Sequence, residues 1–200
     1  MPMKATAVRD SAGVSLAADV PSIIGKAVNC VTRQQEGVAV FSHEVLLLYF
    51  SASWSPPCRA LTPMLRDAWK QVRDHFGGCA MQVVLVPLDH DEADWLDYAK
   101  DMPWLTLHPR THREEIVRLF MHYKIAEAPR LIATDSLGQV VAENVRGTPG
   151  RGFGFGCDPM AAFEHLQALT RVKSRVSVAA DVGRAATVPR TADAGAQRGA

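Results

Sequence analysis

An uninterrupted apolar run from Val45 to Phe50 is the feature that most restricts how this chain can fold. It has the length of a strand and is far shorter than the ~20 apolar residues that a membrane-spanning helix needs. Because its apolar residues are continuous rather than alternating, both faces of the strand must be covered. Such strands occur in sheets that carry helices on both sides, so the run predicts an α/β fold.

The remaining segments alternate between strand and helix patterns. "MQVVLVPLDHD" reads as a second buried strand, and "GKAVNCVTRQQEGVAV" contains a short strand at Ala27 to Thr32. Apolar residues recur at helical spacing after Pro57, and "EADWLDYAKDM", "HREEIVRLFMHYKI" and "MAAFEHLQALTRV" follow as helices. "APRLIATDSLGQVV" reads as a hairpin. This order predicts a central mixed β-sheet flanked by helices on both faces, with a C-terminal β-hairpin plus helix.

Length and charge set the broad class of protein. The 200 residues suffice for one domain with a core, and a formal net charge of +1 provides no overall attraction to nucleic acid or membranes. Residues 1–20 are expected to be loosely ordered, 21–174 to form the domain, and 175–200 to form a disordered tail. With four scattered cysteines and no secretory signal, we expect a cytoplasmic monomer without metal or cofactor.

The segment "SASWSPPCRALTPML" is the candidate site. Pro56 and Pro57 suit the first turn of a helix, whose amides need no internal partner, and Cys58 lies in that turn. A helix N-terminus stabilises a thiolate. Ser55 is a preferred N-cap residue, and accepting a hydrogen bond from the amide of Cys58 would contribute about 1 kcal/mol.

Three motifs together carry a resemblance to a known family. "FSASWSPPCRALTPML", then "MPWLTL", then "APRLIATDSLGQVV" resemble the tryparedoxin and nucleoredoxin branch of the thioredoxin-like superfamily, over roughly residues 25 to 170. The resemblance implies a thioredoxin-like fold, a role in cell redox homeostasis, and thiol or disulfide partners that are proteins or small molecules. It also implies that Pro129 is the family's cis-proline, facing the site.

The site departs from the family pattern at several positions. The family's first cysteine attacks a disulfide and its second resolves the mixed disulfide; only the second matches, as Cys58, while Ser55 takes the attacking position. Arg130 follows the proline, and Leu88 replaces a tryptophan. The expected catalytic positions are therefore Cys58 and the degenerate Ser55. The substrate-binding positions implied by the resemblance are Trp54, Pro56, Pro57, Ala128, Pro129 and Arg130.

Three functions remain open on these residues. In the first, Cys58 alone acts as a monothiol oxidoreductase through mixed disulfides, dithiol reductase activity is weak or absent, and Cys157 is a possible distant resolving thiol. In the second, the site is redox-inactive and binds extended peptide beside Pro129. In the third, Ser55-x-x-Cys58 resembles the Thr-x-x-Cys of one-cysteine peroxidases, which also need an arginine at the thiolate; Arg130 is the candidate.

Overall fold

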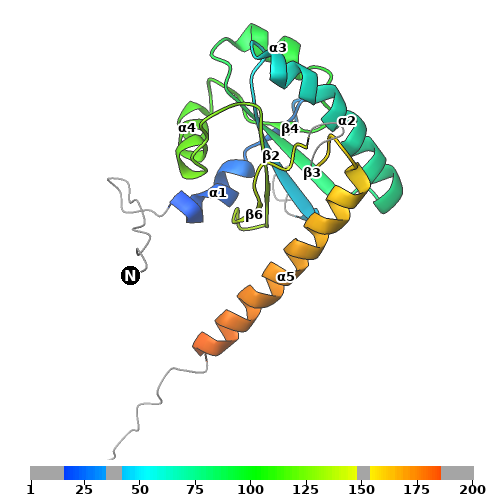
Figure 1. Cartoon of the computed structure of the whole chain (residues 1–200). Coiled ribbons are helices and arrows are strands. Elements are labelled where there is room, and N and C mark those ends of the chain that lie inside the picture. The colour runs from blue at the N-terminus through cyan, green and yellow to red at the C-terminus, as the bar shows by residue number, and fades with distance from the viewer. Residues whose placement is uncertain (1–15, 35–41, 148–153, 186–200) are drawn as a thin grey trace, which may run out of the picture.

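The computed structural model describes residues 16–34, 42–147 and 154–185 of the chain. Its elements form one sheet with surrounding helices (Figure 1). They are α1 (Leu16–Ile24), β1 (Val28–Asn29), β2 (Val45–Ser51), α2 (Pro56–Phe76), β3 (Met81–Pro87), α3 (Glu92–Ala99), β4 (Leu105–Thr106), α4 (Arg113–His122), β5 (Arg130–Thr134), β6 (Val140–Ala142) and α5 (Pro159–Ala185).

The sheet is mixed, as the sequence predicts. Its strand order is β1-β4-β3-β2-β5-β6. The central strands β2, β3 and β4 run parallel to one another, whereas β5 pairs antiparallel with β2, and β6 pairs antiparallel with β5. The short β1 pairs antiparallel with β4 and adds a second antiparallel edge that the sequence did not predict.

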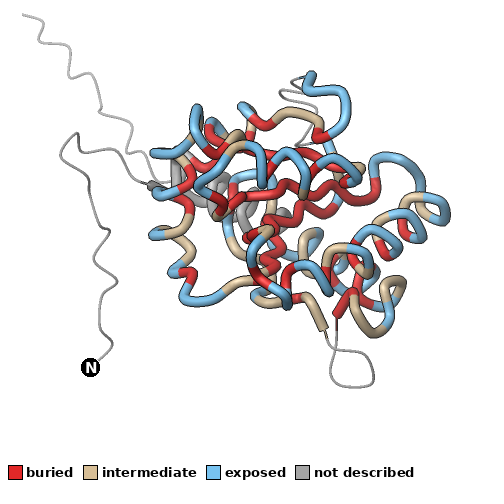
Figure 2. The backbone as a smooth tube through the Cα atoms, turned by 90° about the horizontal axis from the view of Figure 1, so that it is seen from above, coloured by how far each residue is buried: buried red, intermediate tan, exposed pale blue. Residues whose placement is uncertain are grey.

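Strand β2 separates two hydrophobic cores. Leu47 and Tyr49 point into a core shared with α2, α3 and α5, whereas Leu46, Leu48 and Phe50 point into a core shared with α1 and α4. The two faces of the sheet are covered accordingly, with α1 and α4 on one side and α2 and α5 on the other (Figure 1). Figure 2 shows the buried strands inside a shell of half-buried and exposed helical residues. Alternate side chains of one continuous apolar run thus fill both cores.

Helix α1 corrects the prediction of a loosely ordered segment over residues 1–20. It begins at Leu16, and Val20 is fully buried. Val20, Ile23 and Ile24 lie at helical spacing and pack into the α4 core. The pattern is short and contains Pro21, so tertiary packing rather than local propensity stabilises the helix. Residues 1–15 lie outside the described part of the chain.

Helix α5 corrects the prediction of a disordered tail over residues 175–200. It continues to Ala185 and extends beyond the body of the domain (Figure 1). The segment after Lys173 is rich in Ala, Val and Arg and contains no proline before Ala185, so nothing in it breaks the helix. Residues 186–200 are not among the described residues. Within the ranges that are described, no helix is both long enough and apolar enough to span a membrane.

Candidate functional site

The candidate site lies where β2 passes into α2. β2 ends at Ser51 and α2 begins at Pro56. Ser51 is in register with Pro87, the last residue of the parallel strand β3. The loop therefore lies at the carboxyl ends of neighbouring parallel strands, which is where α/β sheets place ligand and catalytic groups.

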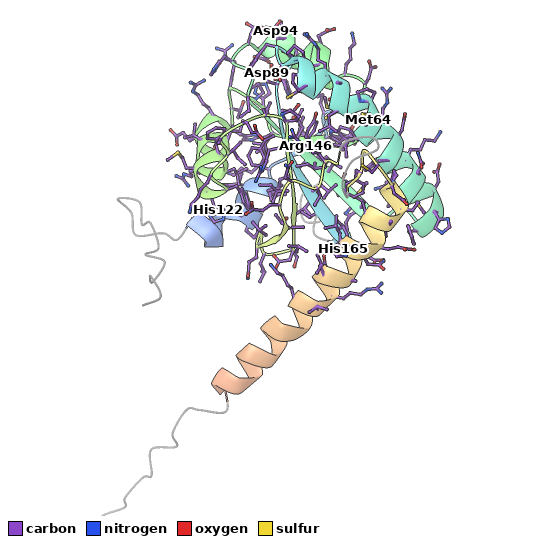
Figure 3. The ribbon with its side chains drawn as sticks, viewed as in Figure 1. Met64, Asp89, Asp94, His122, Arg146 and His165 are labelled. Atoms are coloured by element: carbon purple, nitrogen blue, oxygen red, sulfur yellow. The ribbon has the colours of Figure 1, made fainter. Side chains whose placement is uncertain are left out.

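Asp89, two residues beyond β3, anchors this loop. Its Oδ1 accepts hydrogen bonds from the backbone amide of Ser53 at 2.9 Å and from the Ser53 hydroxyl at 2.6 Å. Arg59 Nη1 donates to the Ser53 carbonyl oxygen at 3.0 Å. Figure 3 shows Asp89 at the end of the sheet, near Asp94 of α3. The sequence did not predict that Asp89 fixes the loop; the one local signal is a carboxylate just beyond the end of a buried strand.

Cys58 is completely shielded from solvent. Its exposed fraction is 0%, and it lies in the first turn of α2, as predicted. Two hydroxyls donate to its carbonyl oxygen, Tyr49 Oη at 3.2 Å and Thr62 Oγ1 at 2.9 Å. The backbone around the cysteine is thereby fixed. A thiol without exposure cannot meet a bulky disulfide until the surrounding loop moves.

Ser55 occupies the N-cap position but does not cap the helix with its side chain. Its backbone is extended, with φ −91° and ψ 114°, and its hydroxyl makes no capping hydrogen bond. The predicted bond from the Cys58 amide to this hydroxyl is therefore wrong. The Ser55 carbonyl does accept the first helical bond, from the amide of Arg59 at 3.1 Å. Pro57, at the second helical position, removes one of the two amides that an N-cap side chain usually bonds and leaves that of Cys58.

Behind the cysteine lies a cluster of four hydroxyl groups that the sequence did not predict. Tyr98 Oη lies 2.7 Å from Ser51 Oγ and 2.7 Å from Thr62 Oγ1, and Tyr49 Oη lies 3.0 Å from Thr62 Oγ1. Burial is the main cause that raises the pKa of Tyr98 and of Tyr49. Both phenols stay protonated at neutral pH, so they act as neutral hydrogen-bond donors. Tyr49 within the apolar run was the only signal in the sequence.

The segment with Pro129 lies at the same end of the sheet. The Ala128–Pro129 peptide bond is cis, and Arg130 begins β5 opposite Phe50, next to the end of β2. Arg146 Nη1 donates to the Pro129 carbonyl oxygen at 3.2 Å, from a part of the chain that Figure 3 shows near the centre of the molecule. Pro129 is buried, whereas Ala128 is half-buried.

The other side chains assigned to the site differ in their surroundings. Trp54 is 62% exposed, and Pro56 and Pro57 are also exposed, so these three form an accessible rim above the buried Cys58. Arg130 Nη2 forms an ion pair with Glu143 at 3.1 Å. The contacts of Arg59 and Arg130 are thus with Ser53 and Glu143 rather than with Cys58.

The remaining cysteines are spread over the fold, and all four thiols are free. Cys30 is buried, and burial raises its pKa to about 12, which makes it unreactive. Cys79 is exposed, and Cys157 is partly exposed just before α5. The glycine-rich segment before Cys157 lies partly in residues 148–153, outside the described residues. Trp95 and Trp104 are core residues.

A parallel-centred sheet with helices on both faces and a Ser-Pro-Pro-Cys turn beside a cis-proline defines a thioredoxin-like protein. The family model that matches, described as thioredoxin-like, covers residues 43–140. Tryparedoxin from Trypanosoma brucei brucei is 35% identical over 104 residues, which are 52% of this chain and 69% of that protein. The chain belongs to the thioredoxin-like family, in the branch of the tryparedoxins and nucleoredoxins.

Nucleoredoxins match over a smaller share of their own length. The Xenopus laevis protein is 35% identical over 99 residues, 50% of this chain and 23% of that protein. Probable nucleoredoxin 1 of Arabidopsis thaliana is 34% identical over 103 residues, 52% of this chain and 17% of that protein. The chain therefore spans about a fifth of the length of these nucleoredoxins.

Solved structures agree with the fold. Native tryparedoxin I from Crithidia fasciculata superposes with a TM-score of 0.56 at 27% identity, covering 65% of this chain and 88% of that one. A tryparedoxin II complexed with glutathionylspermidine gives a TM-score of 0.55 at 27% identity, covering 61% of this chain and 82% of that one.

Proposed function

We propose that this chain takes part in thiol–disulfide exchange through a single thiol, Cys58, and has weak or absent dithiol reductase activity. The observation that carries the proposal is that Ser55 and Cys58 stand at the two motif positions at the start of α2. The turn therefore has the family's second cysteine and lacks the first. A serine hydroxyl cannot form a disulfide. A cycle between a dithiol and a disulfide within this turn is therefore impossible.

The exchange would proceed in two balanced steps. The Cys58 thiolate attacks a partner disulfide, forming a mixed disulfide at Cys58 and releasing one partner thiolate. A second thiol, supplied from outside, then attacks the partner sulfur of the mixed disulfide, which returns Cys58 to its reduced form and joins that thiol to the partner half that was bonded to Cys58. The partner is a protein or a small thiol, in keeping with the glutathionylspermidine bound to a related tryparedoxin.

The shielding of Cys58 determines how fast this chemistry can be. Because Cys58 is 0% exposed while Trp54 is 62% exposed, the partner must first contact the rim formed by Trp54, Pro56 and Pro57. Only after the loop around Ser55 opens does the sulfur become accessible. We therefore expect slow mixed-disulfide formation compared with an exposed thiol.

A test is to incubate the full chain with glutathione disulfide and to map the adducts by mass spectrometry. We expect a glutathione adduct on Cys58 that forms more slowly than the adduct on exposed Cys79 and is reversed by dithiothreitol. The matched variants Cys58→Ser and Cys79→Ser assign each adduct. Modification of Cys79 with none on Cys58 after prolonged incubation would contradict the proposal.

The same shielding favours a second candidate function, non-covalent peptide binding. An exposed indole at the same end of the sheet as a buried cis-proline offers a surface on which an extended chain can pair with backbone groups. Peptide affinity that is unchanged in Cys58→Ser but lost in Trp54→Ala would favour this candidate. The peroxidase alternative gains no support, since the arginine on which it depends, Arg130, is paired with Glu143.

A further inference from the structure

A separate cavity of about 430 Å³ lies at the β1 edge of the sheet, bordered by α3 and by the start of α4. No residue of the Ser53–Cys58 loop lines it. Its apolar walls include Val28 of β1 and Leu96 of α3, which is 39% exposed. Its volume falls in the range of small-molecule sites, which are mostly apolar with a few placed polar groups.

Among the described residues that line this cavity, Arg33 alone carries a permanent positive charge. Its guanidinium carbon lies over the Trp95 ring, 4.8 Å from the ring centre. The indole is fixed in turn, because Trp95 Nε1 donates to Thr106 Oγ1 at 3.2 Å. Arg33 has φ +61°, a left-handed backbone conformation that few residues other than glycine adopt. Arg33 is therefore held in place by its stacking and its turn.

The charges around the cavity are not balanced. Glu92, the one carboxylate among the described lining residues, is already engaged by His108 Nε2 at 3.2 Å and by Arg110 Nη1 at 3.6 Å. Across the described residues, by contrast, no carboxylate forms an ion pair with Arg33. The cavity thus presents one cation whose charge is not matched by a partner, so an anionic group fits it better than a cationic one.

His112 adds a neutral hydrogen-bond donor to the same cavity. The backbone amide of His108 donates to His112 Nδ1 at 3.0 Å, so the neutral ring carries its proton on Nε2. Burial is the main cause that lowers the pKa of His112, so the ring is neutral at pH 7. Arg33 and His112 together supply a charged donor and a neutral donor beside the apolar surfaces of Val28 and Leu96.

We propose that this cavity binds a small organic anion with one carboxylate on a planar apolar body. The carboxylate accepts hydrogen bonds from the Arg33 guanidinium and from His112 Nε2–H, and the apolar body packs against Val28 and Leu96. The site is independent of the chemistry at Cys58, because the two sites share no residue.

The test is calorimetric titration of the full chain with 1-naphthoate, compared with uncharged 1-naphthylmethanol of similar shape. We expect saturable binding of 1-naphthoate and at least about tenfold weaker binding of the alcohol, since a charged hydrogen bond is lost. The Arg33→Gln substitution should also lower the affinity for 1-naphthoate by about tenfold. In NMR spectra of the same samples, one of the tryptophan indole N–H resonances should shift as the site becomes saturated.

Lys100→Gln is the matched control, because it also removes one exposed positive charge but lies outside the cavity. Its affinity for 1-naphthoate should stay within about twofold of the unmodified chain. Three results would each overturn the proposal: no saturable binding up to about 10 mM, equal affinity for the alcohol, or equal losses in Arg33→Gln and Lys100→Gln. None of these results bears on mixed-disulfide formation at Cys58.

Discussion

At the scale of single residues, the proposed one-thiol chemistry depends on Ser55. It is 6% exposed, directly before two exposed prolines, and its hydroxyl makes no capping hydrogen bond. Replacing the Ser55 hydroxyl by a thiol would therefore remove no capping hydrogen bond from the start of the helix. Under that proposal, position 55 differs from the family's attacking cysteine by one atom, an oxygen in place of sulfur.

The first prediction follows from that difference. Ser55→Cys should give the chain dithiol reductase activity, because a second thiol then stands at the family's attacking position beside the rim of Trp54 and Pro56. We expect reduction of insulin disulfides, in the presence of dithiothreitol, at least about tenfold faster than with the unmodified chain, within the typical contribution of a positioned catalytic group.

The control for this prediction is Ser55→Cys combined with Cys58→Ser, which has an attacking thiol but no resolving thiol. Without dithiothreitol, this double variant should stop at a mixed disulfide with insulin; with dithiothreitol, it should reduce insulin no faster than the unmodified chain. If the unmodified chain reduced insulin as fast as Ser55→Cys does, then Ser55 would not be the cause of a missing dithiol cycle, and the one-thiol proposal would fail.

The site was predictable from the sequence only in part. The positions of Ser55 and Cys58 relative to the helix follow from two consecutive prolines, whose geometry is local. The support by Asp89 was not predictable, because it joins residues 36 positions apart and depends on the register of two parallel strands. The exposure of Cys58 depends on the packing of the whole loop, which a linear pattern does not contain.

At the scale of elements, α1 depends on a close approach to the β5–β6 hairpin. Gly138 in the hairpin turn has φ +77°, and a Cβ atom built on it would lie 2.4 Å from Val20 Cγ1 of α1. Tyr123 Oη donates to the Gly138 carbonyl oxygen at 2.7 Å from the end of α4. One glycine thus allows α1, the end of α4 and the hairpin to meet.

The second prediction is that Gly138→Ala destabilises the fold. The left-handed backbone alone costs about 1–2 kcal/mol in a residue with a Cβ atom, and the collision with Val20 adds to it. Urea unfolding should show the loss. Gly78→Ala is the control, because Gly78 has no left-handed φ and its Cβ would meet only the flexible end of Arg73, at 3.4 Å. It should change stability by no more than about 0.5 kcal/mol. Equal losses in both variants would contradict this account.

The elements themselves were predictable where their patterns are long. The strands β2 and β3 and the helices α2 and α4 follow from continuous or periodic apolar residues that local sequence contains. Helix α1 was missed because Val20, Ile23 and Ile24 make only one short stripe, which becomes stable through its contact with α4. The prediction of β1 over Ala27 to Thr32 was too long, because the Asn29 side chain accepts hydrogen bonds from the amides of Val31 and Thr32 and turns the chain.

At the scale of the whole molecule, the helix α4 links stability to pH. His112 precedes α4 and His122 ends it, and burial lowers the pKa of both below the ordinary value of 6.5. Both rings are neutral in both states above that value. As the pH falls through 6.5, the unfolded chain binds protons that the folded chain resists, so the free energy of unfolding decreases.

The third prediction is that the free energy of unfolding falls between pH 7.5 and pH 5.5, and that His122→Gln makes this fall smaller. Carboxylates lower the stability only at a more acidic pH. Lys26 and Glu115 form an ion pair at 2.6 Å, and their hydrogen bond is the main cause that lowers the pKa of Glu115 from 4.5. The stability that this ion pair provides is therefore lost only below pH 4.5. The decrease in the free energy of unfolding between pH 7.5 and pH 5.5 is therefore expected to come from histidines. Chemical unfolding at several pH values measures the slope, with His90→Gln, an exposed position, as the control. A slope that is unchanged in His122→Gln but reduced in His90→Gln would show that the half-buried His122 at the end of α4 is not the source of the pH dependence.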